Sequence, residues 1–168
     1  IIHRDLNPNN ILITEEGNPE ITDFVIGKTT FTRMSATIGP TGTLGTPGYA
    51  APEQYVQDSD TGKYTAVFSR SICLYEILTN GNPLNISYSL EGNSKTILGI
   101  DYQAISEINP KISPAVDDVI RKGLSIDPGN RYQDAGEMHN ALINSLFGDK
   151  GDQSDPSRLT TNLSSSQQ

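Results

Sequence analysis

Three polar side chains near the start of the chain are of types that can bind a divalent cation such as Mg²⁺. Asp5 follows a His-Arg pair, Asn10 comes five residues after it, and Asp23 comes eighteen residues after Asp5. Carboxylate and amide oxygens are the hard donors that Mg²⁺ prefers. Each of these residues alone would more often cap a turn, so the inference depends on the set.

Two short apolar segments are placed to bring Asn10 and Asp23 together. The sequence predicts strands at Ile11–Ile13 and Glu20–Thr22, joined through a turn that contains Gly, Asn and Pro. Asn10 lies just before the first strand, and Asp23 lies just after the second. A hairpin would therefore hold both side chains at one end.

Two further motifs follow in order along the chain. Residues 45–53 read Gly-Thr-Pro-Gly-Tyr-Ala-Ala-Pro-Glu, and residues 127–131 read Asp-Pro-Gly-Asn-Arg. With the His-Arg-Asp loop at residues 3–5 and the Asp-Phe pair at residues 23–24, they make a series of four motifs. By this series the chain resembles the C-terminal lobe of eukaryotic-like Ser/Thr protein kinases of the bacterial type.

The resemblance implies the α+β fold of protein kinases, in which this chain would form the mainly α-helical C-lobe with a short β-hairpin at the catalytic loop. Residues 1–147 would make up this lobe, which includes the activation segment and a helical subdomain. Residues 148–168 would be a disordered tail or linker, because their polar composition cannot bury a face. An N-lobe would come from a longer parent chain, because the sequence has no Gly-rich loop before a strand Lys.

The resemblance also implies a role for each residue of the candidate site. Asp5 would accept the proton of a protein hydroxyl, with ATP as the phosphate donor and Mg²⁺ as the metal. Thr46 would form a hydrogen bond near Asp5 and favour Ser/Thr over Tyr substrates. The implied sets are catalytic Asp5, Asn7, Asn10 and Thr46; nucleotide-contacting Asn7, Asn10 and Asp23; and metal-binding Asn10 and Asp23.

Two arginines have implied partners elsewhere in the lobe. Arg4 would pair with a phosphorylated activation segment, and Arg131 would pair with Glu53 of the Ala-Pro-Glu triplet. Any single hydroxyl in that segment is more simply explained as ordinary loop composition. The candidate phosphorylation sites are Thr29, Thr30, Thr32, Ser35, Thr37, Thr41 and Thr43.

Four positions depart from the family pattern. Asn7 replaces a Lys that would place a positive charge on the transferred phosphate, and such a loss costs on the order of 10²–10³ in rate. Val25 replaces a Gly whose backbone angles a β-branched residue resists. Ala66 replaces an Asp that would accept hydrogen bonds from the catalytic loop, so buried donors there would go unpaired. Ser71 replaces a Gly of the central helix.

These departures leave two functions open. The first is a partial and impaired Ser/Thr kinase domain that transfers the γ-phosphate of ATP to protein hydroxyls. The second is an inactive pseudokinase remnant that acts as a protein-binding module. The retained acidic and amide residues favour the first, whereas the substitutions and the missing N-lobe favour the second.

Three segments predict helices around the catalytic loop. Tyr64–Thr79 is apolar nearly all round, which predicts a buried central helix that ends at Asn80 and Gly81. Ser113, followed by Pro, is a cap for a second helix. Asp134, with Glu three residues later, has the offset of a capping box for a third helix.

Two other stretches predict less regular structure. Residues 25–48 are rich in Thr, Gly and Ser and predict a long loop. Residues 82–99 are ambiguous, with one short helix as a possibility. Cys73, the single cysteine, lies in an apolar run and predicts a buried thiol.

The charge balance limits the kinds of partner. The chain has 20 acidic residues against 12 Lys and Arg, and its formal net charge is −8. Because no basic run is present to neutralise phosphates, we expect a protein substrate or docking partner and no nucleic acid. No apolar stretch has transmembrane length, and the lone cysteine suits a cytoplasmic protein.

Overall fold

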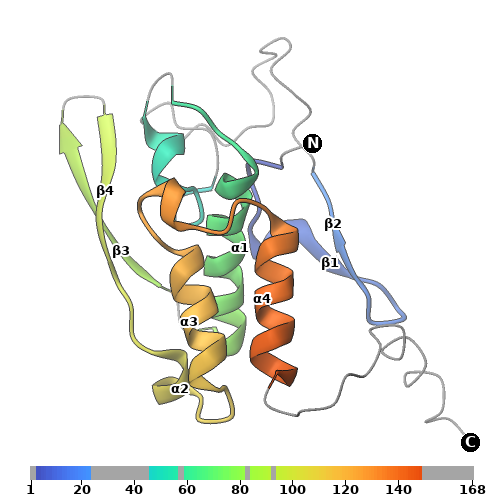
Figure 1. The fold of residues 1–168 in the computed structure, drawn as a ribbon. Coiled ribbons are helices and arrows are strands. Elements are labelled where there is room, and N and C mark those ends of the chain that lie inside the picture. Colours follow the sequence, from blue (N-terminus) through green and yellow to red (C-terminus); the bar gives the residue numbers. More distant parts are fainter. Residues whose placement is uncertain (1–2, 24–45, 57–58, 82–83, 92–93, 149–168) are drawn as a thin grey trace, which may run out of the picture.

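The computed structural model describes residues 3–23, 46–56, 59–81, 84–91 and 94–148. Within them, helices α1, α3 and α4 stand side by side, with a β-hairpin on either side of the group (Figure 1). The helices are α1 Lys63–Leu78, α2 Ile105–Ile108, α3 Pro114–Gly123 and α4 Ala135–Phe147. The hairpins pair β1 Ile11–Ile13 with β2 Pro19–Ile21, and β3 Asn85–Glu91 with β4 Ser94–Asp101. The 3₁₀ helices are η1 Pro8–Asn10, η2 Pro52–Tyr55 and η3 Pro128–Asn130. The prediction of a mainly helical lobe with a hairpin at the catalytic loop is confirmed.

Helix α1 is the central element of the core. It begins one residue before the predicted start, and its largest buried side chains are Val67, Phe68, Ile72 and Tyr75. Ile77 is 63% exposed, so the helix is not buried all round as the sequence predicted. Asn80 and Gly81 have positive φ angles of 60° and 84°, and the Gly81 N–H donates to the Glu76 carbonyl. The predicted helix end is therefore confirmed.

Helices α3 and α4 begin at the predicted caps. The Ser113 hydroxyl accepts the Val116 N–H at 3.4 Å, and the Asp134 carboxylate accepts the Glu137 N–H at 3.0 Å. Glu137 does not return a bond to Asp134, because its carboxylate accepts the Gln133 N–H at 2.8 Å. These caps satisfy backbone donors that each helix would otherwise leave open at its first turn.

The second hairpin corrects the expectation of a possible short helix within residues 82–99. Ile86 and Tyr88 alternate with serines, which is the period of a strand, and both pack on the core. The Tyr88 ring lies edge-on to Tyr55 of η2, with 5.7 Å between the ring centroids. Ile97 of β4 is 4% exposed. Alternating burial against η2 and α1 outweighs any local helical preference here.

Ser71 shows how the lobe accommodates one departure from the family pattern. Its buried hydroxyl donates to the Val67 carbonyl at 2.8 Å. Helix α3 passes so close that a Cβ placed on Gly123 would overlap this hydroxyl. Because Gly123 has no side chain, the Ser71 side chain fits between the two closely packed helices.

Candidate active site

Asp5 lies at the centre of a hydrogen-bonded set that joins the catalytic loop, residues 3–10, to residues 46–56. Its Oδ1 accepts the backbone N–H of Thr46 at 2.8 Å and the Thr46 hydroxyl at 2.7 Å. The Asn7 amide donates to the same Oδ1 at 3.3 Å and to Thr46 Oγ1 at 3.1 Å. These bonds occupy one carboxylate oxygen and leave Oδ2 to accept a proton.

Asn7 forms a neutral bridge inside the loop. The residue is 3% exposed, and its Oδ1 accepts the Asn9 N–H at 3.0 Å, which caps η1. Its nitrogen donates to Asp5 and Thr46 as described above. Both polar ends of the side chain are therefore used to hold the loop.

Asn10 is fixed at the end of η1. Its Nδ2 donates to the Asp5 carbonyl at 2.8 Å, and its backbone N–H donates to the Asn7 carbonyl at 3.0 Å. The residue is 9% exposed. Because the amide nitrogen already has a partner, Oδ1 is the atom left to coordinate a metal.

Asp23 comes to the same end of the first hairpin as Asn10. The Thr22 N–H donates to the Asn10 carbonyl at 2.9 Å, one position beyond the Ile11–Ile21 pair. Asp23 is exposed and has a φ of 57°, a conformation that Asp tolerates better than most residues. One amide and one carboxylate fit Mg²⁺, which often takes one or two carboxylates together with water and phosphate oxygens. Within the described residues, no group of three or more His, Cys, Asp or Glu could hold a metal ion.

His3 ties the catalytic loop to the end of the first hairpin. Its Nε2 lies 2.6 Å from the Thr22 carbonyl, which can only accept, so Nε2 carries the proton. Nδ1 then accepts the Asp5 N–H at 3.3 Å. The backbone donor of Asp5 is thus paired, even though Ala66 replaces the Asp expected to hold this loop.

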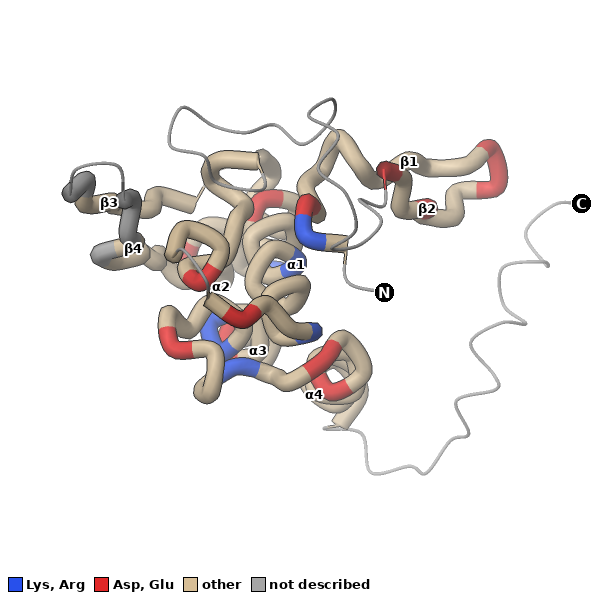
Figure 2. Tube along the Cα trace, turned by 90° about the horizontal axis from the view of Figure 1, so that it is seen from above, with Lys and Arg blue, Asp and Glu red and all other residues tan. Residues whose placement is uncertain are grey.

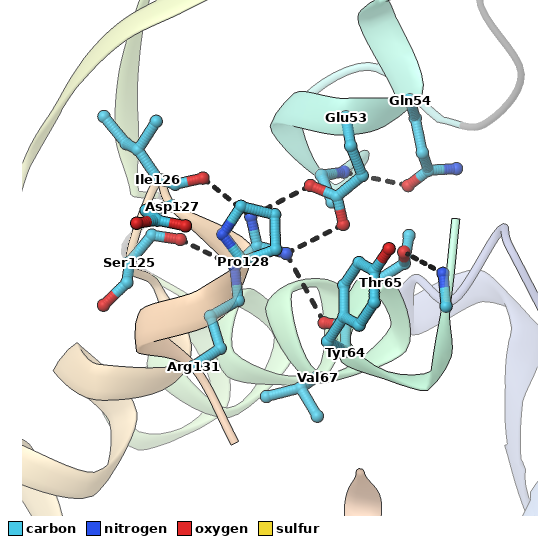
Figure 3. Close-up of polar contacts among 12 residues, drawn as sticks. Glu53, Gln54, Tyr64, Thr65, Val67, Ser125, Ile126, Asp127, Pro128 and Arg131 are labelled. Carbon is cyan, nitrogen blue, oxygen red and sulfur yellow. Dashed lines mark hydrogen bonds and ion pairs between the residues drawn. The ribbon is translucent and has the colours of Figure 1, made fainter. Parts of the chain in front are cut away.

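A buried ion pair anchors the segment that carries Thr46. Arg131 donates from Nη1 and Nη2 to the two carboxylate oxygens of Glu53, at 2.9 Å each (Figure 3). The Arg131 and Glu53 side chains are 0% and 5% exposed. Arg131 also donates to the carbonyls of Ser125 and Ile126. The predicted pairing is confirmed, and such a network holds η2 firmly because breaking it would leave a buried charge uncompensated.

Tyr49 and Glu76 form a pair beside the catalytic loop that sequence reasoning missed. The Tyr49 hydroxyl donates to the Glu76 carboxylate at 2.6 Å. Burial, together with this carboxylate, raises the pKa of Tyr49 above its usual range. The pair borders a cavity of about 430 Å³, whose other lining residues are Pro8, Asn9, Ile77 and Gly81. An acid within the apolar run of α1 is the sequence signal that could have revealed the pair.

Other predicted features lie outside the described residues or concern the surface. Val25, the candidate phosphorylation sites and residues 149–168 belong to the part of the chain that the structure does not describe. Figure 2 shows acidic positions on the β1–β2 turn and around the helices, with basic positions in a few separate places. None of the described helices is both long and apolar enough to cross a membrane.

The sequence is similar to protein kinases over most of its length. A profile of the protein kinase domain matches residues 1–145. A probable serine/threonine-protein kinase of Clostridium perfringens is 38% identical over 144 residues, which cover 82% of this chain and 20% of that protein. The serine/threonine-protein kinase PknL of Mycobacterium tuberculosis is 32% identical over 146 residues, which cover 82% of this chain and 34% of that protein. The chain thus spans only a fifth to a third of these relatives.

Solved structures agree on the fold. A point mutant of the Mycobacterium tuberculosis PknI kinase domain matches with a TM-score of 0.57 and 20% identity, covering 86% of this chain and 46% of that chain. The apo form of PpkA-294 matches with a TM-score of 0.55 and 21% identity, covering 83% of this chain and 46% of that chain. The chain belongs to the protein kinase family, as a C-lobe related to the serine/threonine kinases of bacteria.

Proposed function

We propose that Asp5 accepts the proton of a Ser or Thr hydroxyl on a protein substrate while the γ-phosphate of ATP is transferred to that hydroxyl. The observation that carries this proposal is the convergence of Asp5, Thr46 and Asn10 in one hydrogen-bonded set. Thr46 holds Oδ1, so Oδ2 is the oxygen left to meet the hydroxyl. Positioning of this kind is the main contribution of a protein to phosphoryl transfer, which needs little covalent help.

Asn10 and Asp23 would hold Mg²⁺, and Asn7 would contact the nucleotide with them. The metal, when bound, neutralises charge on the phosphate oxygens. The Oδ1 of Asn10 and the carboxylate of Asp23, at one end of the hairpin, are the donors that support this assignment. Asn7 carries no charge and would orient Asp5, so we expect transfer to be slower by a factor on the order of 10²–10³ than with a cation there.

A longer parent chain would complete the ATP site. The β1–β2 hairpin exposes one apolar face, because Ile13 and Ile21 share a side of the antiparallel ladder, whereas Leu12 is paired with Glu20 on the other side. Leu12 is 54% exposed on one face, while Ile13 and Ile21 are 66% and 40% exposed on the other. Exposed apolar side chains of this kind favour contact with another protein surface. We assign this contact to residues of the parent that include the N-lobe.

The remaining assignments concern the extent and setting of the lobe. Residues 1–147 would act as the kinase C-lobe, and residues 148–168 would link it to other parts of the parent. Helix α4 ends at Phe147 with Gly148 as its C-cap, which supports this boundary. We place the lobe in the cytoplasm, with a protein as its substrate.

The test is transfer of labelled phosphate from ATP to a protein substrate by the parent protein. Asp5→Asn should lower kcat by at least about 10²-fold, because Asn cannot take up the proton. Asp118→Asn removes an exposed carboxylate on α3 and should leave kcat unchanged. Equal activity of Asp5→Asn and the unmodified protein would contradict the assignment.

Asn7 favours a second candidate function, a lobe that binds a protein partner without transferring phosphate. Its amide is buried and committed to Asp5 and Thr46, and it supplies no positive charge. The same transfer assay decides between the two candidates. No detectable transfer by a folded parent protein with Asp5 intact would favour the binding module.

A further inference from the structure

The peptide bond between Arg4 and Asp5 is held at both of its polar atoms by side chains, one from the same loop and one from a distant segment. The Arg4 carbonyl accepts the Gln54 side-chain amide at 2.8 Å. The Asp5 N–H donates to His3 Nδ1 at 3.3 Å. Because both atoms belong to one planar peptide group, the two hydrogen bonds together fix the orientation of the peptide plane that precedes Asp5.

The backbone at Arg4 needs such support. Its φ is 65°, in the left-handed region, where the Cβ of an ordinary residue is unfavourably close to the backbone. Arg is not among the residue types that adopt this conformation readily. Strained positions of this kind persist only where the surrounding structure holds them. The bond from Gln54 comes from a residue fifty positions away, so it depends on the tertiary fold.

Gln54 is itself well fixed. Its Oε1 accepts the Ala51 N–H at 2.9 Å, and its own backbone N–H donates to the Ala51 carbonyl at 2.9 Å. With Oε1 bound to a donor, Nε2 is the end directed at Arg4. The preceding residue, Glu53, is tied to Arg131 by the buried ion pair shown in Figure 3. The Gln54 amide that holds the Arg4 carbonyl therefore belongs to η2, which the ion pair keeps in place.

We propose that Gln54 is a positioning residue for Asp5. Its side-chain amide holds the Arg4–Asp5 peptide in the left-handed geometry, which keeps the Asp5 carboxylate against Thr46. Gln54 also links the Glu53–Arg131 ion pair to the catalytic loop. The effect of Gln54 on phosphate transfer rests on the proposed function, whereas its effect on the Arg4–Asp5 backbone does not.

The test is amide hydrogen exchange in the 168-residue chain. Gln54→Glu keeps an oxygen for the Ala51 N–H but removes the donor to the Arg4 carbonyl. We expect exchange at the Asp5 amide to rise by about three- to tenfold, the range set by one net hydrogen bond. Exchange at the α4 amides should stay unchanged.

Asn109→Asp is the matched control. The Asn109 amide donates to the Leu78 carbonyl at 2.9 Å, and its Oδ1 accepts the Lys111 N–H at 3.3 Å. The substitution therefore also keeps an acceptor and removes a donor to a distant carbonyl, but away from the catalytic loop. It should leave exchange at the Asp5 amide unchanged.

A second variant and a kinetic measurement complete the test. If Gln54→Glu does not fold, Gln54→Met has a similar length, lacks the donor and should show the same local rise in exchange. In a parent protein that transfers phosphate, either variant should lower kcat about tenfold with the KM for ATP unchanged. Unchanged exchange at Asp5, or an equal rise in Asn109→Asp, would overturn the proposal whether or not the parent is active.

Discussion

Asn7 holds Asp5 and Thr46 in place but brings no positive charge to the site. Its amide lies 3.3 Å from Asp5 Oδ1 and 3.1 Å from Thr46 Oγ1, in a buried position. A fixed cation near a transferred phosphate stabilises developing charge far more than a neutral donor does, because little water is present to screen it. This position is therefore where one substitution should change the rate of the proposed reaction most.

We expect Asn7→Lys to raise kcat of the parent protein by a factor on the order of 10². The variant loses the cap that Asn7 Oδ1 provides to the Asn9 N–H, so its free energy of unfolding should fall by about 1 kcal/mol. Phosphate transfer and thermal melting measure the two effects. Asn7→Met, which has a similar length to Lys without the charge, should lose the cap and gain no activity. No gain from Lys would mean that charge at position 7 does not limit the reaction.

The candidate site separates into residues that sequence could identify and residues that only the fold reveals. Asp5 and Asn10 stand in one local motif, and the resemblance to protein kinases implied the place of Thr46, so the sequence could identify all three. Gln54 and Tyr49 act on partners fifty and twenty-seven positions away. No local period or motif encodes those distances, because they arise only when η2 and α1 pack beside the catalytic loop.

Among the elements, helix α3 is tied to the segment before it by Asp117. This carboxylate accepts the Ile105 N–H at 3.1 Å, the Ser106 hydroxyl at 3.1 Å and the Tyr102 hydroxyl. Burial alone would raise the pKa of Asp117, but these hydrogen bonds outweigh burial and lower it below its usual value. The ionised carboxylate therefore stabilises the contact between α2 and α3.

Because Asp117 is ionised in the folded chain, we expect the free energy of unfolding to fall in acid. Its pKa in the folded state lies below the unfolded value of about 3.9, so its contribution is fully present above about pH 4. That contribution is lost as the pH falls through the folded-state pKa. Asp117→Asn should lower the free energy of unfolding by about 1–3 kcal/mol at pH 7, and the difference should shrink below pH 4.

Denaturant unfolding between pH 2 and pH 7 measures this dependence. Asp118→Asn removes the neighbouring exposed carboxylate on α3 and should leave the stability at pH 7 nearly unchanged. A curve for Asp117→Asn that stays parallel to that of the unmodified chain below pH 4 would mean that another group governs acid unfolding.

The elements also show where local patterns were insufficient. Caps at Ser113 and Asp134 and the stop at Gly81 were visible in the sequence because their hydrogen bonds are local. The β3–β4 hairpin was not predicted, although Ile86 and Tyr88 alternate with serines. Burial of Tyr88 against Tyr55 favours the strand, and that contact joins residues far apart in sequence.

At the scale of the whole molecule, the first hairpin stands apart from the helices (Figure 1). Ile13 and Ile21 make one of its faces apolar, whereas Leu12 is paired with Glu20 on the other. Exposed apolar surface of this kind favours contact with another protein surface. Under the proposed function an N-lobe would cover that surface, whereas for the 168-residue chain alone a second copy is the available partner.

We therefore expect the 168-residue chain to self-associate through this hairpin as its concentration rises. Ile13→Lys places a charge on the apolar face and should shift the chain toward the monomer, as sedimentation velocity at several concentrations would show. Leu146→Lys is the matched control, because Leu146 is 57% exposed against 66% for Ile13 but lies in the last turn of α4. A monomeric unmodified chain at all concentrations, or an equal effect of both substitutions, would contradict the assignment, since association would then not depend on the hairpin.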